Sequence, residues 1–192
     1  MLFLIGDALE SFFGPFRLFS SHLFLIVAGT SLGFIVTFIL LPKSYSLLPV
    51  DRGRTFAVES GASKGKPTGA GVVFITVFAV VALFVVPWGW RQLTVLCLVV
   101  AAMVTGFLDD RSEEAWSEYL KGGLDLVISA AAAFLLYDEG SNIWLPFTDA
   151  HIHVSYYVFI PVATLLIWMS INATNCTDGV DGLSSTLVLL AL

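Results

Sequence analysis

Long apolar runs dominate the sequence and restrict the chain to structures that a lipid bilayer can hold. A membrane-spanning helix needs roughly 20 mostly apolar residues. Runs of this kind cover 22–41, 71–90, 93–108, 124–137 and 153–171, and a sixth opens at Leu183. Hydrophobic residues make up 57% of the chain and charged residues 12%, whereas soluble domains are about half apolar and a quarter charged. We therefore expect an all-α, polytopic transmembrane helix bundle with about five spans and the start of a sixth.

The segments 124–137 and 1–21 differ from the other apolar runs. The run at 124–137 is short and carries Asp125 near its start, but its "SAAAAF" stretch is rich in small residues, which suits a helix packed against other helices. Residues 1–21 are amphipathic and are interrupted by Gly14 and Pro15. We predict an interfacial segment over 1–21 at the outer surface, followed by a transmembrane domain over 22–192.

The distribution of basic residues predicts the orientation in the membrane, because cytoplasmic loops carry an excess of Lys and Arg. The loops outside the cytoplasm would be 1–21, 91–92 and 138–152, with only Arg17 and Arg91. The other loops (42–70, 109–123 and 172–182) hold the remaining basic residues: Lys43, Arg52, Arg54, Lys64, Lys66, Arg111 and Lys121. We therefore expect the N-terminus outside and three polar loops together on the cytoplasmic face.

Acidic residues in these loops point to a cation. Asp109 and Asp110 directly follow the run that ends at Leu108, and "NATNCTDGVDGL" follows the fifth run. Carboxylates gathered at one depth repel each other unless a cation neutralises them, and hard oxygen ligands favour Mg²⁺ or Mn²⁺. A solvated helix end is the alternative, since Asp and Gly are common in turns.

The last of these motifs places four polar residues at three-residue intervals, Asn172, Asn175, Asp178 and Asp181. Residues three apart on a helix are rotated by about 60°, so four of them could not all face one ligand on a continuous helix. We expect the helix to end at Gly179, with Asn172 and Asn175 on its last turn and with Asp178 and Asp181 in a Gly-containing turn.

The basic loop "SKGKPTGAG" (63–71) complements the acids. Its small residues permit close backbone approach, and the helix N-terminus that follows attracts phosphate. Ordinary positive-inside anchoring is the alternative for Lys64 and Lys66, and a snorkelling anchor is the alternative for Lys121.

Three motifs in this order resemble a known family. "NATNCTDGVDGL" resembles the Asn-x-x-Asn-x-x-Asp-Gly-x-Asp-Gly-Leu signature of the polyprenyl-phosphate N-acetylhexosamine-1-phosphate transferases. Together with "GFLDD" and "SKGKPTGAG", it is most similar to the bacterial phospho-N-acetylmuramoyl-pentapeptide transferases, over about 43–183. The resemblance implies transfer of phospho-MurNAc-pentapeptide from UDP-MurNAc-pentapeptide to undecaprenyl phosphate, giving lipid I and UMP. This step of peptidoglycan synthesis would take place at the cytoplasmic face of the bacterial cell membrane.

The resemblance also assigns roles to residues. Asp109, Asp110 and Asp178 would be catalytic and would hold Mg²⁺, with Mn²⁺ as the alternative. The lipid phosphate would lose a proton to Asp109 or Asp110 and attack the β-phosphate, either directly or through an aspartyl-phosphate. The substrate-binding residues would be Lys64, Thr68, Lys121, Asn172, Asn175, Asp178 and Asp181.

The chain departs from the family pattern in three respects. Residues 65–71 read Gly-Lys-Pro-Thr-Gly-Ala-Gly, where members usually have Gly-Thr-Pro-Thr-Met-Gly-Gly, and Arg111 stands where an aromatic residue often follows the Asp pair. Members have about ten spans of the length that a bilayer requires, whereas this chain stops at Leu192. The resemblance therefore predicts an N-terminal part that is inactive alone and needs the C-terminal half as its partner, with a homodimer left open.

Two other functions remain as alternatives. A sibling transferase that uses UDP-GlcNAc would share the fold and the metal site, although Thr177 before Asp178 favours the MurNAc-pentapeptide enzyme. An ion-coupled transporter would also use intramembrane carboxylates, but its site should lie near the midplane on broken helices. A nucleic-acid partner is not expected, because the nine Lys and Arg residues are dispersed and the net charge is −6.

Overall fold

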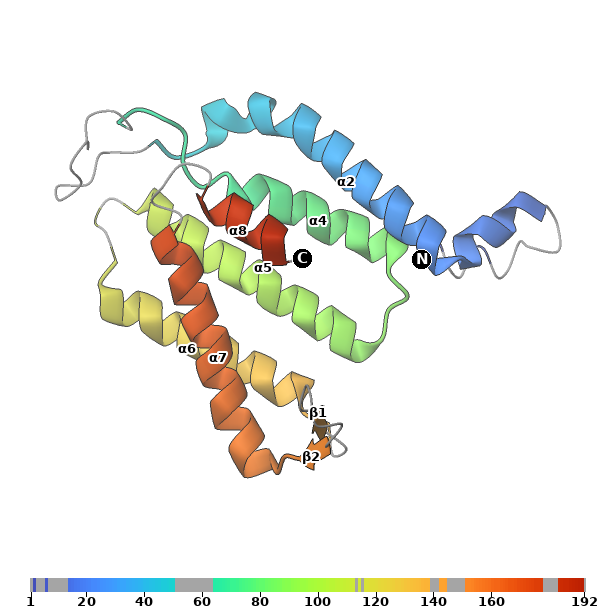
Figure 1. Cartoon of the computed structure of the whole chain (residues 1–192). Helices are drawn as coiled ribbons and strands as arrows, with labels where there is room; N and C mark the ends of the chain where they lie inside the picture. The colour runs from blue at the N-terminus through green and yellow to red at the C-terminus, as the bar shows by residue number, and fades with distance from the viewer. Residues whose placement is uncertain are drawn as a thin grey trace. The chain divides into compact units, whose positions relative to one another are not determined.

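The computed structural model describes residues 2, 6, 14–50, 64–112, 114, 116–138, 142–144, 151–177 and 183–191. Most of these residues are helical (Figure 1), which confirms the predicted all-α class. The chain forms two compact units, Met1–Ala115 and Trp116–Leu192.

The first unit contains three long helices, of which α4 packs against both α2 and α5 (Figure 1). Its elements are η1 (Gly14–Ser20), α2 (His22–Ser44), η2 (Tyr45–Leu47), α4 (Gly71–Val85) and α5 (Trp90–Arg111). Gly29 in the second turn of α2 lies close to the last residue of α4, since a Cβ at Gly29 would lie 3.2 Å from Val85 Cγ1. The two helices are therefore antiparallel, and the end of α2 lies at the same end of the unit as the start of α4.

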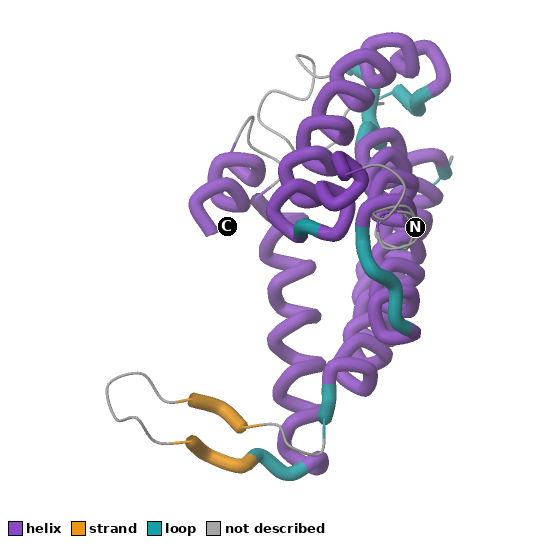
Figure 2. The backbone as a smooth tube through the Cα atoms, turned by 90° about the vertical axis from the view of Figure 1, so that its right-hand side faces the viewer, coloured by secondary structure: helices purple, strands orange, loops and turns teal. Residues whose placement is uncertain are grey.

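The second unit is built on an antiparallel pair of helices. Its elements are α6 (Glu118–Leu136), β1 (Asn142–Trp144), β2 (His151–His153), α7 (Tyr156–Thr177) and α8 (Leu183–Ala191). The Phe134 and Tyr137 rings near the end of α6 lie 5.7 Å and 5.2 Å from the Tyr156 ring at the start of α7. Figure 2 shows β1 and β2 beside this end of α7, paired antiparallel with Ile143 opposite Ile152. These strands were not predicted from the sequence, because three residues are too few to show a strand period.

Proline and capping residues explain where the helices differ from the predicted runs. The run at 71–90 ends as a helix at Val85, because Val86 precedes Pro87 and adopts an extended conformation with ψ 134°. Helix α6 begins six residues before the predicted start at 124. At its observed start, Ser117 Oγ accepts a hydrogen bond from Leu120 N–H at 3.3 Å and caps the helix. Lys121 is consequently a helical residue on α6.

Four helices among the described residues are long and apolar enough to cross a membrane: His22–Leu47, Trp90–Arg111, Glu118–Leu136 and Tyr156–Cys176. Helix α4 is also apolar but has only 15 residues. At 1.5 Å per residue it is about 22 Å long, which is shorter than the hydrocarbon core of a bilayer of about 30 Å. Large apolar side chains on α2 are exposed, with Phe34 at 69% and Phe38 at 71%. These features support a polytopic membrane protein.

Candidate active site

In the first unit the basic loop lies against the end of α5 that carries the aspartates. Gly69 is the point of approach: a Cβ placed there would lie 3.2 Å from Phe107 Cδ2, 3.3 Å from Pro49 Cγ and 3.4 Å from Asp110 Oδ2. The structure therefore brings together two of the three polar loops, as predicted. They meet where α2 ends and α4 begins.

The basic loop is anchored to the segment that follows α2. Thr68 N–H donates a hydrogen bond to Pro49 O at 2.8 Å, and Thr68 Oγ1 donates to the same oxygen at 3.3 Å. Val50 and Pro67 form an isolated β-bridge beside these bonds. A hydroxyl has a single proton to donate, so Thr68 must leave Pro49 before it can donate to a substrate phosphate. Its substrate-binding role stays a prediction.

Lys64 and Lys66 are exposed on the same loop. Gly65 between them has φ +92°, in the left-handed region that favours glycine. The local backbone thus depends on Gly65, and the two lysines lie on a loop whose far end, at Gly69, is close to Asp110.

Gly69 provides a test of this arrangement. Its φ of +69° strains any residue with a Cβ, and Phe107 and Pro49 would have to move to make room for that atom. We expect Gly69→Ala to lower the free energy of unfolding by more than about 1 kcal/mol, as measured by denaturant titration in detergent.

Gly65→Ala is the matched control, because Gly65 also has a positive φ but has open space where its Cβ would lie. Gly65→Ala should introduce only backbone strain, so it should lower the free energy of unfolding less than Gly69→Ala does. Equal losses in the two variants would show that the contacts with Phe107, Pro49 and Asp110 contribute nothing.

The Asp pair lies in the last turn of α5, where Asp109 is half-buried and Asp110 exposed. Consecutive helical residues are rotated by about 100°, so the two carboxylates leave the helix in different directions. Ser112 N–H donates to the carbonyls of Leu108 and Asp109 and ends the helix. The C-terminal end of a helix dipole is negative and disfavours nearby carboxylates. The position therefore adds to the electrostatic demand for a cation.

In the second unit, Lys121 and Asn172 are brought to one end of the α6–α7 pair. Trp168 Nε1–H donates to Gly122 O at 2.8 Å, and Asn172 Nδ2–H donates to Trp168 O at 2.8 Å. Asn172 is half-buried, and Asn175 is exposed in the last turn of α7.

The predicted end of the helix after the asparagines is close to the observed one, since α7 ends at Thr177. Asn175 lies on the last turn, as expected, and Asn172 lies one turn earlier. Asp178 and Asp181 lie outside the described residues, so their positions in the site stay predictions.

Comparison with known proteins places the chain in a family. The sequence model of glycosyl transferase family 4 matches residues 92–192, which is just over half of the chain. The chain belongs to glycosyl transferase family 4. The matched region contains the Asp pair, Lys121 and both asparagines, and the basic loop precedes it.

Three curated relatives of this family 4 member carry the same name. Those from two strains of Treponema pallidum, both named phospho-N-acetylmuramoyl-pentapeptide-transferase, are 43% identical over 188 residues, covering 96% of this chain and 52% of the relative. A relative of the same name from Acetivibrio thermocellus is 28% identical over 185 residues, covering 92% of this chain and 56% of the relative. The chain thus spans about half the length of the curated relatives it matches.

The carboxylate donors of this family 4 chain fit a hard cation in chemistry. Within the described part of the chain, no three His, Cys, Asp or Glu side chains lie close enough together to hold a metal ion. The described carboxylates at the site are Asp109 and Asp110. Magnesium usually takes one or two carboxylates and completes its shell with waters and substrate phosphates, so Asp109, Asp110 or both would match that number of protein ligands.

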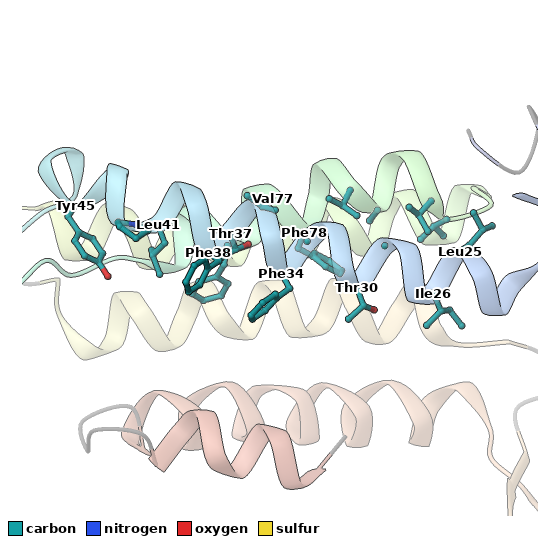
Figure 3. A pocket seen from close by; sticks show the side chains of 18 residues that line it. Leu25, Ile26, Thr30, Phe34, Thr37, Phe38, Leu41, Tyr45, Val77 and Phe78 are labelled. Atoms are coloured by element: carbon teal, nitrogen blue, oxygen red, sulfur yellow. The ribbon is translucent and has the colours of Figure 1, made fainter. Parts of the chain in front are cut away.

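An apolar groove of about 920 Å³ lies between α2 and α4 of the family 4 chain. Figure 3 shows Phe34, Phe38 and Phe78 along it, with Tyr45 at the end of α2. Thr30 and Thr37 contribute hydroxyl groups to a lining that is otherwise mostly aliphatic and aromatic. A surface of this composition suits contact with lipid, and the polar chemistry of the site lies elsewhere.

Proposed function

We propose that the full-length protein transfers phospho-MurNAc-pentapeptide from UDP-MurNAc-pentapeptide to undecaprenyl phosphate, producing lipid I and UMP. The proximity of the lysine-bearing loop to Asp110 at Gly69 carries this proposal, because it places basic residues that could bind phosphate on the same loop as a position beside the Asp pair. The named relatives support a phosphosugar transferase of peptidoglycan synthesis. The exact donor and acceptor are our proposal.

In the proposed reaction, Lys64 and Lys66 attract the phosphates of the nucleotide sugar, and Lys121 and Asn172 help to hold it. Asp109 or Asp110 accepts the proton of the lipid phosphate, whose oxygen then attacks the β-phosphorus. The new P–O bond forms as the bond to UMP breaks, and UMP leaves with the bonding electron pair. Mg²⁺ bound by the aspartates would neutralise charge on the phosphates, which is the main contribution of the metal in phosphoryl transfer.

The two alternative functions make different demands on the site. A transferase that uses UDP-GlcNAc would have the same loops and aspartates, and only the sugar selected would differ. An ion-coupled transporter would need its carboxylates near the middle of the membrane on broken helices. Asp109 and Asp110 instead lie in the last turn of an unbroken helix of 22 residues, which favours a transferase.

Release of UMP by the full-length protein, measured with each nucleotide sugar in turn, separates the three functions. We expect UMP from UDP-MurNAc-pentapeptide in the presence of undecaprenyl phosphate and Mg²⁺, and none from UDP-GlcNAc. Release from UDP-GlcNAc alone would establish the sibling transferase, and release from neither would contradict a transferase.

We also propose that the site faces the cytoplasm and that the N-terminus lies outside. In a background without Cys97 and Cys176, which are both exposed, a membrane-impermeant maleimide added to intact cells should label the Ile152→Cys variant and not the Glu114→Cys variant. Both side chains are exposed, so labelling reports membrane sidedness. Labelling of the Glu114→Cys variant in sealed cells would contradict the orientation.

A further inference from the structure

A single tryptophan connects two candidate substrate-binding residues in the second unit. Its indole Nε1–H donates to Gly122 O at 2.8 Å across 46 positions of sequence. The ring also packs beside Gly122, where an added Cβ would lie 3.8 Å from Trp168 Cζ2, in ordinary van der Waals contact. The ring of Trp168 therefore lies against the backbone of α6, next to Lys121.

The backbone carbonyl of the same tryptophan also fixes the side chain of Asn172. Asn172 Nδ2–H donates to Trp168 O at 2.8 Å, one helical turn back along α7. Asn172 is half-buried, and this bond gives its amide a defined orientation. A continuous path of hydrogen bonds thus runs from the backbone carbonyl beside Lys121, through Trp168, to the side chain of Asn172.

We infer that Trp168 is a positioning residue that sets the placement of Asn172 relative to Lys121 and thereby the affinity for the nucleotide sugar. The inference rests on the proposed function, in which both residues bind that substrate. Without the indole N–H, the hydrogen bond from Trp168 on α7 to Gly122 O on α6 is lost. Substrate binding should weaken, while proton transfer and phosphoryl transfer at Asp109 and Asp110 should continue.

The test compares kinetic constants of Trp168→Phe with those of the unchanged full-length protein. Phenylalanine keeps an aromatic ring and removes only the donor and part of the ring area. We expect the KM for UDP-MurNAc-pentapeptide to rise about threefold to tenfold, the effect of one lost hydrogen bond. The kcat should change less than the KM.

Trp88→Phe is the matched control. Trp88 Nε1–H donates to Leu83 O at 3.0 Å in the first unit, just beyond the end of α4 that is remote from Gly69. This variant also loses an indole hydrogen bond, and its KM should stay unchanged. Gly122→Ala keeps the accepting carbonyl and should likewise keep the KM.

Each outcome decides the matter. If the unchanged protein is active and Trp168→Phe has the same KM, the inference is overturned and the proposed function stays intact. An equal rise in KM in Trp88→Phe also overturns it, because the effect would then be general destabilisation. If the unchanged protein releases no UMP from UDP-MurNAc-pentapeptide, the proposed function fails and the inference fails with it.

Discussion

Replacing Asp109 with asparagine in the full-length protein is expected to lower the rate of UMP release about a hundredfold or more while the helices stay folded. Asparagine keeps the size of the side chain and removes the charge that would bind the cation or accept the proton. Loss of one group that stabilises transition-state charge typically costs a few kcal/mol. The same loss is expected for Asp178→Asn. UMP release at saturating Mg²⁺ measures both.

Asp138→Asn is the control for these variants, because Asp138 follows the end of α6 that is remote from Lys121. It removes one carboxylate outside the site and should leave the turnover near normal. Size-exclusion profiles in detergent would show that all three variants remain folded. Near-normal turnover of Asp109→Asn or Asp178→Asn would exclude the role assigned to that residue.

Residues 1–192 alone are expected to insert in the membrane and to release no UMP, even with Mg²⁺ and undecaprenyl phosphate. The chain spans about half the length of its curated relatives, and we propose that the counterpart of the other half completes the pocket. Lipid cannot provide hydrogen bonds to the polar groups of a half-formed site. Turnover is measured on the purified 192-residue chain, freed of host enzyme.

Co-production of the C-terminal half as a separate chain should restore turnover, since membrane helices inserted independently can associate afterwards. Co-production of an unrelated membrane protein is the control. Magnesium-dependent UMP release by the purified 192-residue chain would show that the described helices suffice for catalysis.

The membrane-spanning helices were predictable because apolar length is a strong signal, whereas their ends were not. The run at 71–90 looks continuous in hydropathy, but Pro87 divides it into the end of α4 and the turn before α5. At 124–137 the apolar run is shorter than the helix, because α6 begins six residues earlier, at Glu118 after its N-cap Ser117, and its first turns include Glu118 and Lys121. Local backbone chemistry determined these boundaries.

The candidate site was predictable where sequence order and charge indicate it. Positive-inside counting placed the basic loop and the Asp pair on one side, and the structure brings them together at Gly69. Trp168 was not predictable as part of the site, because a tryptophan in an apolar run is typical of a side chain that faces lipid. Its bond to Gly122 depends on helix packing over 46 positions, which no local pattern reveals.

Joint detection of both products tests the central claim most directly. Purified full-length protein is supplied with UDP-MurNAc-pentapeptide, undecaprenyl phosphate and Mg²⁺, and UMP is quantified beside the lipid product by mass spectrometry. The proposed transfer predicts UMP and undecaprenyl-diphospho-MurNAc-pentapeptide in equal amounts, with neither formed when undecaprenyl phosphate is omitted. UMP release without the lipid acceptor, or no product from an otherwise folded protein, would contradict it.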